Sequence, residues 1–180
     1  VRNASYWSLF ATPISGLTYG HNSIWPWLYE GETILNHEQT EGYPSWEEAI
    51  HFPGSAQVGY LGEFVRSFEW WEFRPAGDLL ADQPGEEVYN HFISVIRNPE
   101  NGTILCYIPV RETVRIFNPS GISYAGEWFD PVENSYTDAD IENGGNILTA
   151  VSSRDRDRVL ILRPTNFASD YVRLNESSIY

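Results

Sequence analysis

The sequence contains no lysine, no methionine and a single cysteine. All 11 basic residues are arginines, and they face 25 acidic residues, which gives a formal net charge of −14. This excess of negative charge excludes the basic footprint that nucleic-acid binding requires, and it disfavours binding to anionic membrane surfaces. We interpret the charge as a source of solubility in an extracellular or saline environment.

The single cysteine and the absence of long apolar runs exclude an internal disulfide and a membrane-spanning helix. Cys106 cannot form an internal disulfide, and its apolar neighbours at 104–108 predict a small buried side chain. No apolar run reaches the length of about 18 residues that a membrane-spanning helix needs, so we expect no membrane insertion. The four histidines are scattered, so we expect no metal site and no cofactor. Because the chain starts at Val1 and lacks methionine, we expect a processed product, a fragment or part of a longer protein.

Aromatic residues are abundant, with 7 Trp, 11 Tyr and 9 Phe. Such side chains form the usual platforms for sugar rings, but they are equally ordinary core material. Three N-x-S/T sequons, at Asn3, Asn101 and Asn175, permit N-glycosylation if the protein is secreted.

Helical periodicity dominates the first 75 residues. Helices are predicted at 3–10, 46–50 and 53–68, with Ser45 as the N-cap of the second and Pro53 starting the third. A short strand is predicted at 17–19. It breaks at Gly20 and is followed by a long loop, 25–44, of the length typical of functional lids.

Strand signals dominate the second half. We predict strands at 88–97, 103–110, 113–117, 123–129, 146–152 and 158–163, separated by Asn, Gly and Pro turns that indicate an antiparallel β-sandwich. The predicted organisation is an α/β segment at 1–75, a linker at 76–85, an all-β sandwich at 86–165 and a tail at 166–180. The mixed-charge run 154–158 is interpreted as an exposed hairpin, and the acidic run 138–144 as a surface loop rather than a calcium site.

Several of these pieces, taken in order, resemble one family, the apiosidase-like glycoside hydrolases. The residues that carry the resemblance are Tyr6 and Trp7, the stretch from Leu17 to His21, Ile24 and Trp25, Trp46 to Ala49, Pro53 to Gln57, Trp71, Arg74 and Pro75, Glu127 to Pro131, and Val159 to Leu162. In that family a TIM barrel precedes a small β-sandwich named as a collagen-binding domain of a collagenase.

The resemblance implies that residues 1–75 are the last part of a (β/α)8 barrel, with 3–13 as its seventh helix, 17–19 as its eighth strand and 53–68 as its eighth helix. The catalytic carboxylates of the family lie on earlier strands, so no catalytic residue is assigned in this chain. The expected function is the C-terminal part of a retaining glycoside hydrolase acting on extracellular polysaccharide. Its expected partners are a carbohydrate ligand and either the N-terminal barrel portion or a companion chain. Without those strands, Tyr6, Trp7, Phe64 and Phe68 are expected to expose an apolar face.

Barrel sites form at the C-terminal ends of the strands, which makes the residues after 17–19 the predicted substrate site. His21 and Asn22 are predicted to hydrogen-bond a sugar hydroxyl or a catalytic carboxylate, Trp25 or Trp27 to stack on a sugar, and Tyr19 to support the site. The alternative is that these side chains are structural. Glu30, Glu32, Glu38 and Glu41 are acidic, but a flexible loop does not provide the fixed carboxyl spacing of a glycosidase. Two other functions remain open, a non-catalytic carbohydrate- or matrix-binding module and a structural surface protein.

Overall fold

The computed structural model describes residues 1–12, 14–33 and 42–165. Three α-helices come first, α1 (Arg2–Ala11), α2 (Trp46–Ala49) and α3 (Pro53–Arg66). Short 3-10 turns follow at η2 (Trp70–Glu72), η3 (Gly77–Leu79), η4 (Pro84–Glu86) and η5 (Tyr89–His91). The rest of the described chain is strand and connecting loop, so the fold is rich in β-sheet.

The helices form where the sequence predicts them. In α1, Tyr6, Leu9 and Phe10 recur at helical spacing and are all buried. Pro53 occupies the first turn of α3, where its missing N–H costs nothing. The Ser45 side chain accepts a hydrogen bond from the Glu48 backbone N–H at 3.3 Å, which confirms the predicted cap of α2.

The strands make two antiparallel sheets. The larger sheet has the order β1-β2-β3-β9-β5-β6, and the smaller has the order β4-β8-β7. Their bounds are β1 (Arg74–Pro75), β2 (Ser94–Arg97), β3 (Ile104–Ile108), β4 (Thr113–Phe117), β5 (Tyr124–Asp130), β6 (Ser135–Ala139), β7 (Glu142–Asn143), β8 (Ile147–Val151) and β9 (Arg158–Pro164).

The two sheets enclose the first hydrophobic core. Inward-facing residues alternate along each strand, as Val114 and Ile116 do on β4, while the residues between them are exposed. Cys106 on β3 is fully buried in this core beside Leu160 of β9, as the sequence predicts, and burial raises the pKa of its thiol.

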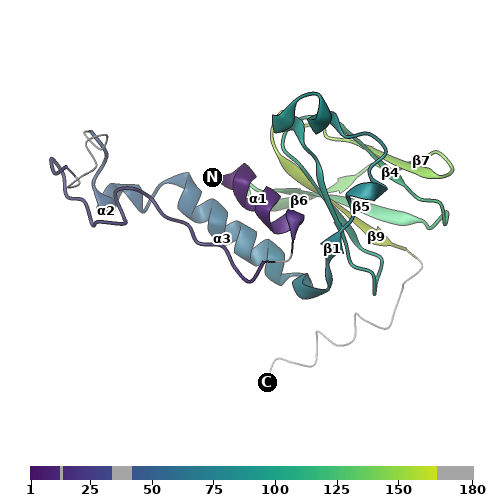
Figure 1. Ribbon diagram of the computed structural model, residues 1–180, viewed down its shortest axis with the longest axis horizontal. Helices are drawn as coiled ribbons and strands as arrows, with labels where there is room; N and C mark the ends of the chain where they lie inside the picture. Colours follow the sequence, from purple (N-terminus) through teal and green to yellow (C-terminus); the bar gives the residue numbers. More distant parts are fainter. Residues whose placement is uncertain (13, 34–41, 166–180) are drawn as a thin grey trace, which may run out of the picture.

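A second core lies on the opposite face of the larger sheet, where α1 and α3 pack (Figure 1). Its sheet residues are Ile96, Leu105, Tyr107, Phe129, Val159 and Ile161, and its helical residues include Tyr6, Phe10, Leu61 and Phe64. Phe64 stacks on Phe129 with ring centroids 4.5 Å apart, and Tyr6 stacks on Tyr107 at 4.8 Å. The molecule therefore has three layers, with the larger sheet buried on both faces.

This second core corrects the expected apolar face of the helices. Tyr6 and Phe64 are 0% and 1% exposed, and Trp7 and Phe68 are half-buried. The sequence prediction was wrong because it assigned the covering role to barrel strands, whereas the sandwich sheet of the same chain covers these side chains.

Three strand predictions also need correction. Residues 17–19 form no strand, because a barrel strand needs a hydrogen-bonded neighbour on each side and the described chain offers none there. The predicted strand 88–97 begins only at Ser94, because the Gln83 side chain bonds both the N–H and the C=O of Ile93, at 3.0 and 2.9 Å. The polar edge strand β6 was missed, since Ser135–Ala139 has no apolar alternation.

The segment 76–85, predicted as a linker, is packed rather than loose. Ala76 and Leu80 are buried in the sandwich core, and Leu80 forms an isolated bridge with Ile116 of β4. The Ala81 N–H donates to the Arg115 carbonyl at 2.8 Å. The connection between the helices and the sheets is thus held in place along its length.

Among the described residues, no helix combines the length and the apolar character that crossing a bilayer requires.

Candidate functional site

The predicted substrate residues lie in a tight turn before α2. The His21 carbonyl accepts the backbone N–H groups of Ile24 and Trp25, both at 3.0 Å. The His21 ring nitrogen Nδ1 accepts the Ser23 backbone N–H at 3.1 Å. Because Nδ1 is an acceptor here, the neutral ring carries its proton on Nε2, which makes Nε2 a hydrogen-bond donor.

His21 and Asn22 converge on Tyr43, which comes from the far end of the loop. The His21 ring meets Tyr43 edge to face at 6.4 Å and Phe52 at 5.3 Å. The Asn22 side-chain amide donates to the Tyr43 hydroxyl at 3.3 Å. Sequence reasoning missed Tyr43, because nothing in the pattern of a long loop indicates which of its aromatic residues folds back.

Tyr19 lies over the first turn of α3. A Cβ atom placed on Gly54 would be 2.8 Å from the Tyr19 hydroxyl and 3.2 Å from its ring, so a larger residue there would push the tyrosine side chain aside. Tyr19 is half-buried and lies two residues before His21 in the sequence. This placement fits the supporting role that the sequence suggested for it, which stays a prediction.

Two tryptophans stand at the surface of this region. The side chains of Trp25 and Trp27 are 70% and 59% exposed. Trp27 has a positive φ of 55° and contacts Trp46 edge to face at 5.0 Å, which fixes its indole against α2. Both rings are accessible, as a sugar-stacking platform requires.

The acidic residues of the loop make no catalytic pair in the part that the structure describes. Glu30 and Glu32 are exposed, and the Glu32 carboxylate accepts the Tyr29 backbone N–H at 3.1 Å, so it closes its own turn. His37, Glu38 and Glu41 lie outside the described residues. No group of three or more His, Cys, Asp or Glu side chains within the described ranges is placed to hold a metal ion.

The sequons differ in their surroundings. The Asn101 side chain accepts the Thr103 N–H at 3.0 Å in a surface turn. The Asn3 side chain lies 3.0 Å from the Tyr107 hydroxyl, between α1 and the sheet, where an attached glycan would have to displace that contact. Asn175 lies outside the described residues.

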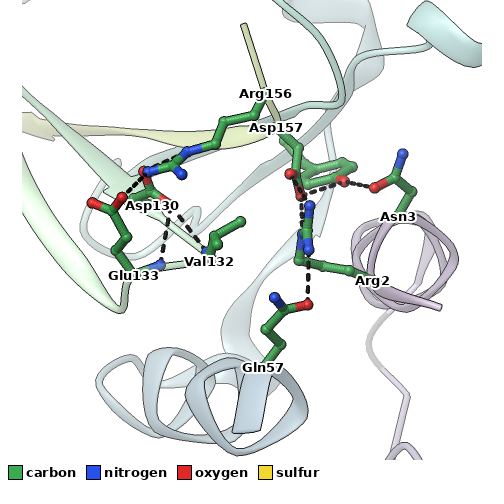
Figure 2. A network of polar contacts seen from close by, with 9 residues as sticks. Arg2, Asn3, Gln57, Asp130, Val132, Glu133, Arg156 and Asp157 are labelled. Carbon is green, nitrogen blue, oxygen red and sulfur yellow. Dashed lines mark hydrogen bonds and ion pairs between the residues drawn. The ribbon is translucent and has the colours of Figure 1, made fainter. Parts of the chain in front are cut away.

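A buried polar network joins the two halves of the chain (Figure 2). Arg2 donates two hydrogen bonds to Asp157, at 2.6 and 2.7 Å, and a third to Gln57 of α3 at 2.7 Å. The Tyr107 hydroxyl lies 3.0 Å from both Asp157 and Asn3, and it can donate its proton to one of them at a time. The hydrogen bonds to Asp157 raise the pKa of Arg2.

This network corrects the interpretation of run 154–158 as an exposed hairpin at its later residues, whereas Arg154 and Asp155 are exposed as predicted. Asp157 and Arg158 are 2% and 3% exposed, and Arg156 pairs with both Asp130 and Glu133. The Asp130 carboxylate also accepts the backbone N–H groups of Val132 and Glu133, at 3.0 and 3.2 Å. The signal that could have located these contacts was missing, because partners 155 residues apart leave no local pattern.

An apolar groove remains open between α1 and α3. It has a volume of about 280 Å³. Its lining includes Leu9, Ile14, Leu17, Val58, Leu61 and Val65. Residues 14–17 line the groove and lead directly into 17–19, the segment that the resemblance places at the eighth barrel strand.

The comparisons with known proteins agree with this geometry. Residues 1–72 match the model of the family described as "Apiosidase-like, catalytic domain". A search of curated proteins finds no match. A solved structure titled "Glycoside hydrolase" is 23% identical, with a TM-score of 0.75, and the match covers 94% of this chain and 37% of that one. A glycoside hydrolase family 5 structure from Bacteroides vulgatus is 22% identical, with a TM-score of 0.73 and the same coverage.

This chain therefore spans little more than a third of the length of these structures. At this level of identity the structures show a shared fold. Over residues 1–72 the chain resembles the apiosidase-like catalytic domain, and its fold is that of part of a glycoside hydrolase.

Proposed function

We propose that this chain is the C-terminal portion of a retaining glycoside hydrolase that acts on extracellular polysaccharide. The catalytic carboxylates would then lie on an N-terminal barrel portion, in the same polypeptide or in a companion chain. One observation carries the proposal: the match to a catalytic domain covers residues 1–72, whose described part contains helices and turns but no β-strand.

The open groove between α1 and α3 supports the proposed partner. A side of α3 that is not covered by the sheet presents Val58 and Val65 to this groove, together with Ile14 and Leu17. Barrel helices pack on strands through such apolar residues. Neighbouring barrel strands, pairing with residues 17–19, would fill the groove and convert that segment into a strand.

The chain itself would then contribute to substrate binding. The turn at 21–25 would stand at the mouth of the completed barrel, where His21 Nε2 and the Asn22 side chain can reach a sugar hydroxyl or orient a carboxylate. Trp25 offers a ring on which a sugar can stack. This chain alone would be inactive, because hydrolysis with retention needs two carboxyl groups about 5 Å apart.

The test begins with native and denaturing mass spectrometry of the protein from its natural source. A larger polypeptide, or a second chain that co-purifies, is expected. Release of reducing sugar from plant and microbial polysaccharides is then measured on that assembly, and proton NMR of the first product reports retention or inversion. A lone 20.6 kDa chain, or inversion at the anomeric carbon, would contradict the proposal.

The site is tested with His21→Ala and Trp25→Ala in the whole assembly. Both are expected to lower kcat/KM by about tenfold to a hundredfold, the range for lost hydrogen-bonding or stacking contacts in a site. Tyr89→Ala is the matched control, because Tyr89 is an exposed aromatic residue (86%) outside this region. Equal activity of all three variants would remove the turn at 21–25 from the site.

A further inference from the structure

A cleft opens in the sandwich, where the smaller sheet is too short to cover the larger one. β7 pairs with only Leu148 and Thr149 of β8, so the described residues place no strand beside this edge of β8 beyond Thr149. β6 is likewise the last strand of the larger sheet. The cleft has a volume of about 340 Å³, within the range of about 300–1,000 Å³ typical of small-molecule sites.

The floor of the cleft consists of Trp128, Thr137 and Arg158, and Asp138, Asp140 and Glu142 line its wall. Trp128 and Thr137 are paired across β5 and β6, which places their side chains on the same face of the sheet. Trp128 and Arg158 are 4% and 3% exposed, whereas the three acids are exposed. Trp128 and Arg158 are thus the buried part of the floor, Thr137 is exposed beside them, and the wall is acidic and faces solvent.

Arg158 is the unusual member of this floor. One guanidinium N–H donates to the Thr137 hydroxyl at 2.8 Å, and the guanidinium lies 5.0 Å from the Trp128 ring centroid. No carboxylate among the described residues forms an ion pair with Arg158, and its Nε has no hydrogen-bond partner there. Arg2 and Arg156, by contrast, are both paired with buried carboxylates.

Burial without an ionic partner is costly for a guanidinium. Desolvation lowers the pKa of Arg158, which reflects the same cost. A ligand that accepts hydrogen bonds from the guanidinium would offset this cost.

The chemistry of the wall narrows the class of ligand. A free anion attracted by Arg158 would be repelled by the three carboxylates of the wall, and a cation attracted by them would be repelled by Arg158. Stacking on Trp128 is blocked on the ring face that the guanidinium covers. A neutral polyhydroxylated molecule satisfies both sets of groups, because each hydroxyl can donate to a carboxylate and accept from the guanidinium.

We propose that this cleft binds a neutral sugar residue by hydrogen bonds to Arg158 and to the acids of the wall. The site lies in the sandwich, away from the turn at 21–25, and it requires no catalytic partner. It gives the sandwich a carbohydrate-binding role of its own, whatever the outcome for the helical half.

The test is a titration of the full 180-residue chain, labelled with ¹⁵N, with neutral sugars (glucose, galactose, xylose and arabinose, as monosaccharides and disaccharides). At least one of them is expected to shift the Trp128 indole and Arg158 Nε signals saturably, with a Kd in the millimolar range that is usual for one weakly held small ligand. Galacturonate, acetate and Ca²⁺ are the comparison probes. The proposal is overturned if no neutral sugar shifts these signals, or if only a charged probe does.

Two variants assign the effect to the cleft. Arg158→Met keeps an unbranched stem against Trp128 but removes the donors, and Glu142→Gln alters only an exposed wall acid. Each is expected to weaken sugar binding by about tenfold or more, the effect of one lost charged hydrogen bond. Arg163→Met is the matched control, since Arg163 lies on the same strand, over the Phe68 ring on the opposite face.

Thermal unfolding confirms that each variant is folded. If Arg158→Met does not fold, Glu142→Gln and Thr137→Val provide the same comparison. Unchanged affinity in the folded cleft variants, or an equal loss in Arg163→Met, would overturn the assignment.

Discussion

Arg2→Ala tests whether the helical and sheet halves form one cooperative unit. The substitution removes two hydrogen bonds to Asp157 and one to Gln57, and it leaves the Asp157 carboxylate, which is 2% exposed, with the Tyr107 hydroxyl as its remaining partner. Breaking a fully buried ion pair costs about 3–5 kcal/mol. Because the Arg2 side chain is 26% exposed, water can partly replace it, and we expect a loss near the lower limit, about 3 kcal/mol.

The assay is urea unfolding followed by tryptophan fluorescence and by far-UV circular dichroism. The wild-type chain is expected to unfold in one transition that both probes report together. Arg115→Ala is the control, because the Arg115–Asp82 pair has a similar length, 2.7 Å, but is exposed at 45% and 62%. Its loss should cost less than about 1 kcal/mol.

A double-mutant cycle separates the pair from its surroundings. Adding Asp157→Asn to Arg2→Ala removes the unpaired buried charge, so the double variant is expected to be more stable than Arg2→Ala alone. The reasoning is refuted if Arg2→Ala lowers the free energy of unfolding by no more than Arg115→Ala does. It is also refuted if the double variant loses the sum of the free energies that Arg2→Ala and Asp157→Asn lose separately.

Three further outcomes are expected. Gly85→Ala should destabilise the fold by about 1–3 kcal/mol in urea unfolding, because a Cβ atom there would lie 2.5 Å from the Phe92 backbone. Gly77→Ala is the control and should cost less, because a Cβ atom at Gly77 would have no atom within 4 Å. The free energy of unfolding should fall as the pH rises above about 10, because burial raises the pKa of Tyr6 and Tyr107 in the folded state, so these tyrosines ionise first in the unfolded chain. Tyr107→Phe should make this fall of stability with pH less steep. An equally steep fall in Tyr107→Phe would contradict the explanation. Cys106, which is 0% exposed, should react with a thiol reagent only as fast as the chain unfolds, so labelling at the rate of a free thiol in native buffer would contradict the described core.

Local signals explain which elements could be predicted from the sequence. The helices α1 and α3 follow from apolar spacing and from Pro53, and β4 has the bounds that its alternation indicates. The strand β6 escaped prediction because its stability comes from pairing with β5, not from its own apolar pattern. Residues 17–19 look like a strand in isolation, yet strand formation depends on neighbours.

In the candidate site, too, only the residues with a local signal in the sequence could be predicted. The turn at 21–25 could be located from its polar and aromatic cluster, but Tyr43 could not, because its contact with His21 depends on the path of the loop. The role of Asp157 was hidden for a similar reason. A run of alternating charges resembles a solvated turn, and only the tertiary fold shows that Arg2 is its partner.

The packing of α1 and α3 on the larger sheet has a consequence for any polysaccharide that touches both halves. The aromatic turn near α2 and the end of the sandwich that bears β7 lie at opposite ends of the molecule (Figure 1). A flexible tether would let two binding modules adjust their separation, with an effective concentration set by its length. Here the connection at 76–85 is packed into a core, and α1 and α3 are packed against the larger sheet, so these helices keep one position relative to the sandwich. A polysaccharide that touched both halves would therefore meet the helices and the sandwich in one fixed arrangement.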